Sequence, residues 1–387
     1  MDRSNLKPSW QHQLQRGTLT NGKALHYSYV DLAKATDTLT FDQRFLNPAF
    51  TPMWPDTPFK EIKYASLLDI LPESKHYLLV DQPRYVGSMQ QYARQLLNSV
   101  KRFFLAIWND KTKIVMHSGG YDSRIISLAL MELRQQEGDA WLGDIHFRCH
   151  QPEEDLFKII MQAEGWRPDQ YSCYDGPQLD YYDIGNPRAV FNGWHNYNQA
   201  MNFWRDIIPP GSENEHICIT GFGGEMFKFL AMYNDKGARQ KYCDNNHLNI
   251  LLDYNPGQGQ WEGAWNNMWA DLWQPFWSYE YLSYSLSCPP EWCTWDVDHD
   301  NIRKEIIKAS GLVELADLPH GKHDYTWNIS TERYAYMMHA WQHSLFYRHH
   351  AHTAPDINPI KNMYKWDARM WAFHTVYDEI FKNRKPC

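Results

Sequence analysis

The chain has 387 residues, of which 43% are hydrophobic, 22% are charged and 15% are aromatic. This length and composition are typical of a globular protein that buries a large core. The formal net charge of −8 argues against a protein that binds nucleic acid through a generally basic surface. No segment approaches the roughly 18 consecutive apolar residues of a membrane-spanning helix. The polar segment Met1–Gln15 lacks the pattern of a signal peptide.

The seven cysteines are irregularly spaced, which favours reduced thiols over a disulfide framework. Cys288 and Cys293 are the only close pair in the sequence, and without a second pair they do not predict a zinc site. Together with the absence of a signal pattern, these thiols predict a cytoplasmic protein.

The N-terminal region is rich in proline and turn signals and contains short strand-like runs such as Tyr77–Val80. A small β-rich region is therefore predicted over residues 1–85. From Ser88 to Ile107 apolar residues recur at helical spacing, and Ser88 with Gln91 forms a capping-box pattern. A long helix is predicted here, at the start of a second domain that covers residues 86–387.

Strand and helix signals then alternate. The predicted strands are Lys113–Met116, Ile145–Cys149, Tyr171–Tyr174 and His216–Thr220, and the predicted helices begin near Ser123 and Glu153, the latter ending at Gly165. This alternation predicts an α/β fold in which helices flank both faces of a parallel sheet. From about Glu225 onward the signals are mainly helical.

The loop between the first of these strands and its helix carries the strongest functional signal. Two adjacent glycines let the backbone approach an anion closely, at the positive end of the helix dipole. Hydroxyls flank them, and a carboxylate follows that could hold Mg²⁺ on bound phosphates. No Gly-Lys-Ser/Thr follows, so this is not a Walker A loop. The residues predicted to bind nucleotide here are Ser118, Gly119, Gly120, Tyr121, Asp122 and Ser123.

Residues 118–123 resemble the SGGxDS signature of the PP-loop ATP pyrophosphatases, which cleave ATP between the α and β phosphates. Residues 220–227 resemble the second motif of the asparagine synthetase branch, usually Ser/Thr-Gly-x-Gly-Gly/Ala-Asp-Glu-Leu-Phe. The resemblance implies that Glu225 takes the place of an aspartate that ligates a second Mg²⁺, whereas Met226 replaces a glutamate. It also implies nucleotide contacts for Gly221, Gly223 and Gly224.

Further along the chain the resemblance to this family is looser. Gln274–Trp277 takes the place of a Pro-Phe-Leu-Asp segment, and residues 301–322 resemble a helix followed by Leu-Pro and a lysine. In the family that lysine stabilises negative charge as pyrophosphate leaves, and the matching residue is Lys322. The resemblance extends over about residues 86–330.

Residues 71–81 resemble the last strands of the family's N-terminal glutaminase domain, so residues 1–85 are interpreted as a remnant of it. A glutaminase of this type requires a cysteine after the initiator methionine, and this chain has Asp2. Glutamine hydrolysis is therefore not expected.

The resemblance implies an ATP-dependent, AMP- and pyrophosphate-forming carbon–nitrogen ligase. ATP would lie across the carboxyl ends of the strands, with adenine near Phe147 and Mg²⁺ held by Asp122 and Glu225. A small-molecule carboxylate would be adenylated, and ammonia or an amine would displace AMP, with Lys322 and Glu225 as catalytic residues. The nitrogen would come from free ammonia, from an amine substrate, from an amine within the same molecule or from a separate partner, and a partner could also carry the substrate.

Other functions stay open. The basic and aromatic residues of the C-terminal part mildly favour a PP-loop enzyme that modifies a nucleic acid or nucleobase, against the acidic net charge. The substituted Glu225 and Met226 suggest a catalytically altered nucleotide-binding protein. His339 and His343 have the spacing of one helix face, but no carboxylate lies between them as in a metalloprotease motif. The sequence identifies neither the substrates nor the oligomeric state, and a homo-oligomer is one of the open states.

Overall fold

The computed structural model describes residues 19–26, 29–46, 56–65, 83–150, 153–174, 212–221, 223–224, 271–293, 301–319, 331–352, 374 and 376–382. Its central element is a five-stranded sheet in the order β6-β5-β4-β7-β8, with every pair of neighbours parallel. The strands are β4 (Thr112–Met116), β5 (Ile145–His150), β6 (Tyr171–Tyr174), β7 (His216–Ile219) and β8 (Asp271–Trp273).

The order of the strands reverses between β4 and β7. From β4 the chain continues to β5 and β6 on one side, whereas β7 and β8 lie on the other side. Val115 of β4 pairs with Phe147 of β5 and with Ile219 of β7, so β4 and β7 end side by side. In open α/β sheets, ligands bind outside the carboxyl ends of the strands at such a reversal.

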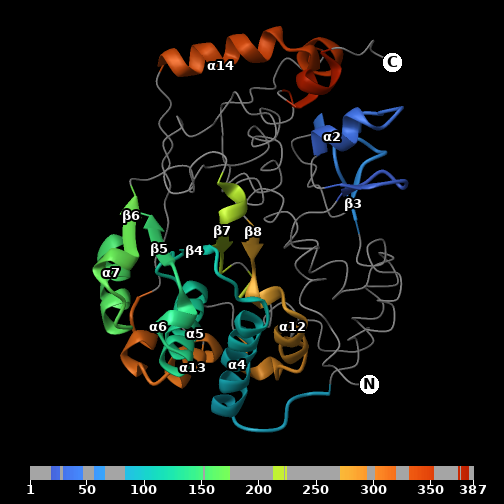
Figure 1. Ribbon diagram of the computed structural model, residues 1–387. Helices are drawn as coiled ribbons and strands as arrows, with labels where there is room; N and C mark the ends of the chain where they lie inside the picture. The colour runs from blue at the N-terminus through green and yellow to red at the C-terminus, as the bar shows by residue number, and fades with distance from the viewer. Residues whose placement is uncertain are drawn as a thin grey trace.

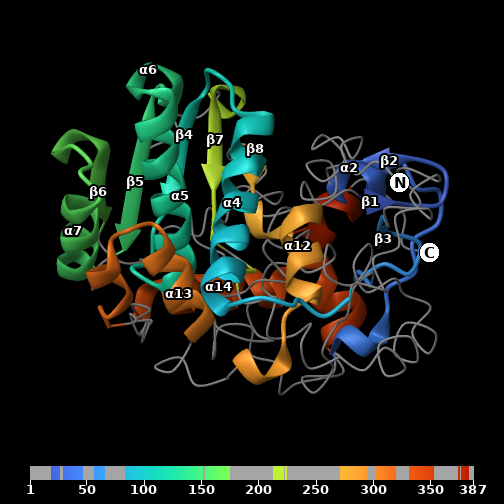
Figure 2. The same ribbon diagram turned by 90° about the horizontal axis from the view of Figure 1, so that it is seen from below.

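Helices α4 (Met89–Ile107), α5 (Tyr121–Glu137) and α13 (Asn301–Ala309) pack against one another. Figure 2 shows α4 and α5 lying over the strands, with α13 crossing them at one end. The other helices near the sheet are α6 (Asp139–Leu142), α7 (Glu154–Ala163) and α12 (Tyr279–Leu286). The described residues also form short 3-10 helices, which are η2 (Gln43–Leu46), η4 (Pro168–Gln170), η6 (Glu213–Glu215), η8 (Pro275–Trp277), η9 (Pro290–Trp292) and η11 (Val313–Ala316).

Local sequence explains how α4 and α5 form and pack. The capping box is present at the start of α4, because Ser88 Oγ accepts from the Gln91 N–H and Gln91 Oε1 accepts from the Ser88 N–H, both at 3.2 Å. The apolar faces of both helices lie in the main core. Between the two helices, the ammonium of the buried Lys101 on α4 forms an ion pair with the Glu132 carboxylate on α5 at 2.7 Å. This pairing offsets the free-energy cost of burying the lysine charge.

A second, smaller core joins described segments between residues 19 and 65 to described segments between residues 331 and 382. It includes an antiparallel sheet of β1 (Leu19–Thr20), β2 (Leu25–His26) and β3 (Lys63–Tyr64), with α2 (Tyr29–Lys34), α14 (Thr331–His343), the π-helical η12 (Tyr347–Ala351) and the helical residues 376–381. The ring of Phe59 lies 6.2 Å from that of Tyr377 and 5.9 Å from that of Phe381. Figure 1 shows this group on the side of the molecule away from α4 and α13.

The predicted parallel sheet with flanking helices is confirmed, and strands β4 to β7 lie where the sequence predicts them. Helix α5 begins at Tyr121, two residues before the predicted start. Strand β8 was not predicted, because three residues are too few to show alternation. The predicted strand Tyr77–Val80 lies outside the described residues. None of the described helices is both long and apolar enough to cross a membrane.

Candidate functional site

The loop from β4 to α5 has the geometry of an anion-binding turn. Gly119 has a φ of 68°, a left-handed conformation that favours glycine. Gly120, in extended conformation, is the N-cap of α5. The first N–H groups of a helix have no carbonyl partner within it, so together with the dipole they attract an anion. At this loop the backbone therefore supplies the positive potential.

Hydrogen bonds hold the loop in this shape. Ser118 Oγ accepts from the Gly120 N–H at 3.3 Å, and Ser123 Oγ donates to the Gly120 carbonyl at 3.0 Å. Ser123 is buried, whereas Ser118 is exposed and Asp122 is partly exposed. Among residues 118–123, Ser118 and Asp122 are thus the ones whose side chains can meet a ligand.

A chain of hydrogen bonds runs from the loop into the core through His117. The Gly119 N–H donates to His117 Nδ1 at 3.2 Å, so the neutral ring carries its proton on Nε2, which lies 3.3 Å from Ser127 Oγ. Ser127 donates to Glu164 Oε1 at 2.7 Å, and the Trp166 indole donates to Glu164 Oε2 at 2.7 Å. Burial lowers the pKa of His117 to about 3, so its ring is uncharged near neutral pH.

The second glycine loop lies directly against the first. Because β4 and β7 are neighbours, their loops leave the sheet side by side. A Cβ atom on Gly221 would lie 3.1 Å from Ser123 N, and one on Gly224 would lie 2.4 Å from Asp122 Oδ1. The buried Tyr281 of α12 fixes this position, since its hydroxyl donates to the Gly224 carbonyl at 2.8 Å. The two predicted motifs therefore meet at the Asp122 carboxylate.

Arg303 of α13 contacts this carboxylate from another element. Its guanidinium lies 2.9 Å from Asp122 Oδ1 and 5.4 Å from the centre of the Tyr121 ring. Sequence reasoning gave Arg303 no role. The sequence feature that could have identified Arg303 is its position between Ile302 and Ile306, where a charged residue falls on the buried face of an amphipathic helix.

Arg124 makes the reverse connection, from α5 to the segment after α13. Its fully buried guanidinium donates to the carbonyls of Gly119 (2.9 Å), Leu315 (2.9 Å), Leu318 (3.1 Å) and Pro319. Burial lowers its pKa to about 10, so the group is still charged near neutral pH. This second residue missed by sequence reasoning ties the loop between β4 and α5 to residues 315–319.

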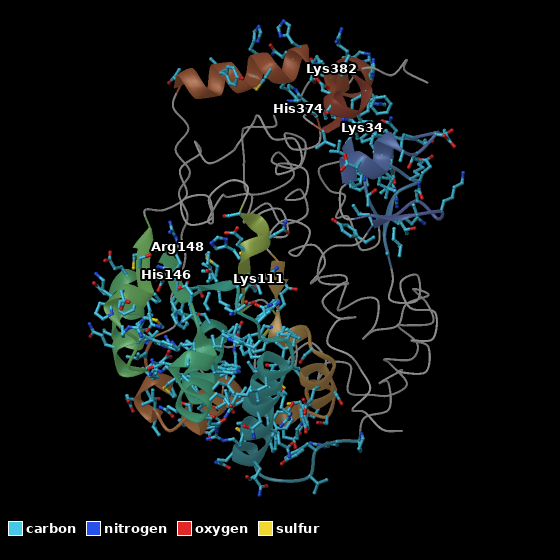
Figure 3. The ribbon with its side chains drawn as sticks, viewed as in Figure 1. Lys34, Lys111, His146, Arg148, His374 and Lys382 are labelled. Carbon is cyan, nitrogen blue, oxygen red and sulfur yellow. The ribbon has the colours of Figure 1, made fainter. Side chains whose placement is uncertain are left out.

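Two predicted nucleotide contacts lie in the core instead. Phe147 is fully buried on β5, with its ring 4.5 Å from that of Trp166, so its side chain does not reach a ligand surface. Alternation along the strand places His146 and Arg148 on the other face, and both are seen on β5 in Figure 3. The Tyr121 ring is also buried, with the guanidinium groups of Arg124 and Arg303 both near it, so only its backbone can meet a ligand.

The two predicted catalytic residues, Glu225 and Lys322, lie outside the described residues. In the sequence Glu225 follows Gly224 directly, and Lys322 follows Pro319 by three residues. The described part of the chain contains no group of three or more metal-ligating side chains. Gly223, also predicted to contact nucleotide, has a φ of 92° within the second loop.

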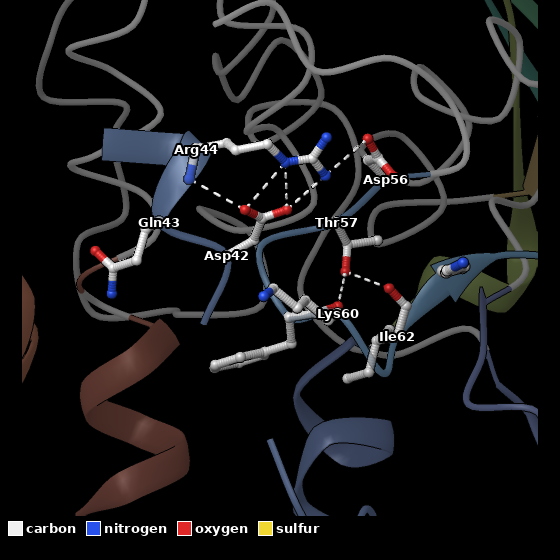
Figure 4. A pocket seen from close by; sticks show the side chains of 9 residues that line it. Asp42, Gln43, Arg44, Asp56, Thr57, Lys60 and Ile62 are labelled. Atoms are coloured by element: carbon white, nitrogen blue, oxygen red, sulfur yellow. Dashed lines mark hydrogen bonds and ion pairs between the residues drawn. The ribbon is translucent and has the colours of Figure 1, made fainter. Parts of the chain in front are cut away.

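Two other features of the structure lie away from these loops: the histidine pair noted in the sequence, and a cavity. The imidazoles of His339 and His343 stack at 4.0 Å on α14, and His343 Nδ1 lies 2.8 Å from the His339 carbonyl. A cavity of about 520 Å³ is lined by Asp42, Gln43, Arg44, Asp56, Thr57, Phe59, Lys60, Ile62 and Lys63 (Figure 4). In this cavity Arg44 is paired with Asp42 at 2.5 Å and with Asp56 at 3.3 Å, and none of the predicted site residues contributes to it.

Comparison with known proteins does not identify a family for this chain. No protein-family model matches the sequence, and no curated protein matches it. The argument for function therefore rests on the geometry of the two loops.

If the two loops bind ATP, Gly224→Ala is expected to weaken that binding by about tenfold or more, because the added Cβ would lie 2.4 Å from Asp122 Oδ1 and displace the carboxylate. Calorimetric titration with ATP and Mg²⁺ measures this. Gly22→Ala is the control, since Gly22 has a positive φ but open space around it, and only stability should fall. Equal ATP affinity in the wild type and Gly224→Ala would contradict this arrangement of the loops.

Glu164→Gln is expected to change how stability depends on pH. Burial raises the pKa of Glu164 to about 8 from an ordinary value of 4.5, although Arg124 and Arg134 lower it in part. The native state therefore holds its proton more tightly, and the wild type loses stability as the pH rises from about 4.5 to about 8. The Glu164→Gln variant should not show this decrease in the free energy of unfolding, which is on the order of a few kcal/mol in the wild type.

Denaturant unfolding of both proteins between pH 5 and 8 tests this expectation. The lowered pKa of His117 acts in the opposite direction, because its stabilising effect is lost as the pH falls below about 6.5. That loss should be common to both proteins. Parallel pH profiles of the two free energies would show that Glu164 does not titrate in this range.

Proposed function

We propose that this chain binds ATP at the loops following β4 and β7 and uses it to adenylate a carboxylate, releasing pyrophosphate, before an amine or ammonia displaces AMP. The observation that supports this most strongly is the meeting of two glycine loops at one carboxylate. They come from segments about a hundred residues apart and lie at the strand-order reversal of a parallel sheet. This is the place where a PP-loop enzyme of the asparagine synthetase type would bind ATP.

If residues 118–123 were only a turn that caps α5, the second glycine loop would not need to pack against them. Gly224 has to be bare because Asp122 Oδ1 occupies the space of a Cβ, and Gly221 packs on the backbone of the same helical turn. The second loop therefore packs too closely on Asp122 and Ser123 to carry side chains at these two glycines, and the Asp122 carboxylate between them is partly exposed. Such close approach suits a ligand that is held mainly by main-chain N–H groups.

In the proposed reaction the chain acts mainly by positioning and electrostatics. The N–H groups at the start of α5 hold the pyrophosphate end of ATP, and the exposed Ser118 hydroxyl is available beside them. A carboxylate oxygen attacks the α-phosphorus, the bond to the β-phosphate oxygen breaks, and pyrophosphate leaves. The amine nitrogen then attacks the acyl carbon, AMP leaves, and the nitrogen gives its proton to solvent.

The carboxylates proposed for this site suit a Mg²⁺ ion that binds together with the phosphates of ATP. Mg²⁺ is commonly bound through one or two carboxylates, with phosphate oxygens and water completing its octahedron. Asp122 supplies one carboxylate, and Glu225, which follows Gly224, is the residue that would supply a second. When bound, the ion neutralises charge on the departing pyrophosphate.

A catalytically altered nucleotide-binding protein is the second candidate function. One observation favours it, because the Asp122 carboxylate is already neutralised by Arg303. Such a protein would bind ATP without forming pyrophosphate. The same experiment separates the two candidates.

Asp122→Asn is expected to reduce substrate-stimulated pyrophosphate release at least about a hundredfold, because the amide keeps the shape but loses the charge that holds the metal. Pyrophosphate and AMP are measured with ATP and Mg²⁺, with pooled carboxylates, amines and nucleic acids added separately. Asp139→Asn is the matched control, since Asp139 is exposed on α6.

The pool that stimulates release would name the substrate class. Stimulation by the nucleic-acid pool alone would replace the ligase with an enzyme that modifies nucleic acid. ATP binding without pyrophosphate from any pool would contradict the adenylation proposal and support the second candidate.

A further inference from the structure

Arg303 is an unusual residue for its position. It lies on the face of α13 that carries Ile302, Ile306 and Ile307 into the core, and it is only 4% exposed. Removing a guanidinium from water is unfavourable unless a partner of opposite charge compensates for the lost hydration. For Arg303 this partner is Asp122, which lies 181 residues earlier in the sequence. Helix α13 packs on both α4 and α5, so the guanidinium is held at the carboxylate by its surroundings.

The two oxygens of Asp122 are in different situations. Oδ1 accepts a hydrogen bond from the Arg303 guanidinium at 2.9 Å. It also lies so close to Gly224 that a Cβ atom there would be only 2.4 Å away. Oδ2 has no hydrogen-bond partner among the described residues, and the side chain keeps 21% of its exposure. One oxygen is therefore fixed by the protein, and the other is available to a cation.

The charge of Arg303 opposes any second cation at this carboxylate. A guanidinium and a divalent ion that share one carboxylate repel each other, and partial burial reduces the screening by water. A free Mg²⁺ ion thus meets a carboxylate that is already neutralised. A Mg²⁺ ion bound to a nucleoside triphosphate brings enough negative charge to outweigh this repulsion.

We propose that Arg303 is an internal countercation that makes metal binding at Asp122 conditional on the nucleotide. It keeps the carboxylate paired and oriented when no nucleotide is bound, and it prevents divalent ions from occupying the site alone. This inference rests on the proposed function only in taking Asp122 as the metal ligand. Arg303 is a positioning residue, because it acts through Asp122.

The test measures metal binding in the absence of ATP. Mg²⁺ is titrated by calorimetry, and Mn²⁺ by electron paramagnetic resonance, into the full-length wild type and the variants Arg303→Met, Arg303→Gln and Arg303→Lys. Removing the charge is expected to tighten binding of the free metal by at least about tenfold, whereas the lysine variant should resemble the wild type. Arg303→Gln keeps a donor for Asp122 and serves if the methionine variant does not fold.

Two controls assign the effect to this site. Arg102→Met removes an exposed guanidinium that pairs with Glu280 between α4 and α12, and it should leave metal affinity unchanged. Adding Asp122→Asn to Arg303→Met should abolish the gain. Linkage gives a further readout, since the factor by which Mg²⁺ tightens ATP binding should fall by a similar amount in Arg303→Met.

Unchanged or weaker binding of free metal in both uncharged variants would overturn the proposal, even if the wild type forms pyrophosphate. A gain in metal affinity that requires Asp122 would support it, even if no pyrophosphate is formed under any condition. Failure of this inference and failure of the proposed function are therefore distinguishable.

Discussion

The site depends on how the Asp122 carboxylate is enclosed. One of its oxygens is in contact with a bare glycine Cα from the loop after β7 and with a guanidinium from α13. A side chain on Gly224 would occupy the same space as the carboxylate, and loss of Arg303 would leave a partly buried charge unpaired. Three segments that are distant in sequence are therefore fitted around one group at the start of α5.

Buried charge has a structural use in this protein. Arg124 and Arg303 are each almost fully enclosed, and each reaches from one element to another, so they join α5 to residues 301–319 in both directions. Arg124 satisfies four backbone carbonyls, including that of Gly119 in the loop between β4 and α5. An apolar residue could fill the same space but could not satisfy those carbonyls or fix the conformation of the loop. The neutral chain through His117, Ser127 and Glu164 supports the same loop from the core side.

Local sequence predicted the parts of the fold that depend on local physics. The apolar runs of β4 and β5 and the capping box of α4 are visible within a few residues, as are the glycines that leave the strand ends. Strand β8 has only three residues, so its pairing with β7 depends on tertiary contact. For Phe147, alternation predicts a strand but not which face is covered, and here the covered face is the one that carries its ring. The pairing of Arg303 with Asp122 could not be predicted, because the two residues are 181 positions apart and meet only through the packing of α13 on α5.

Two features reduce the negative charge of the proposed site. In the motif that the chain resembles, Met226 takes the place of a carboxylate, and in the structure Arg303 places a positive charge beside Asp122. A less negative site attracts free cations more weakly and attracts a polyphosphate more strongly. The negative charge needed for metal binding would then come mainly from the substrate. If the chain binds ATP as proposed, the substitution at Met226 and the placement of Arg303 act in the same direction, because the phosphates of the nucleotide would then supply the negative charge that holds the metal.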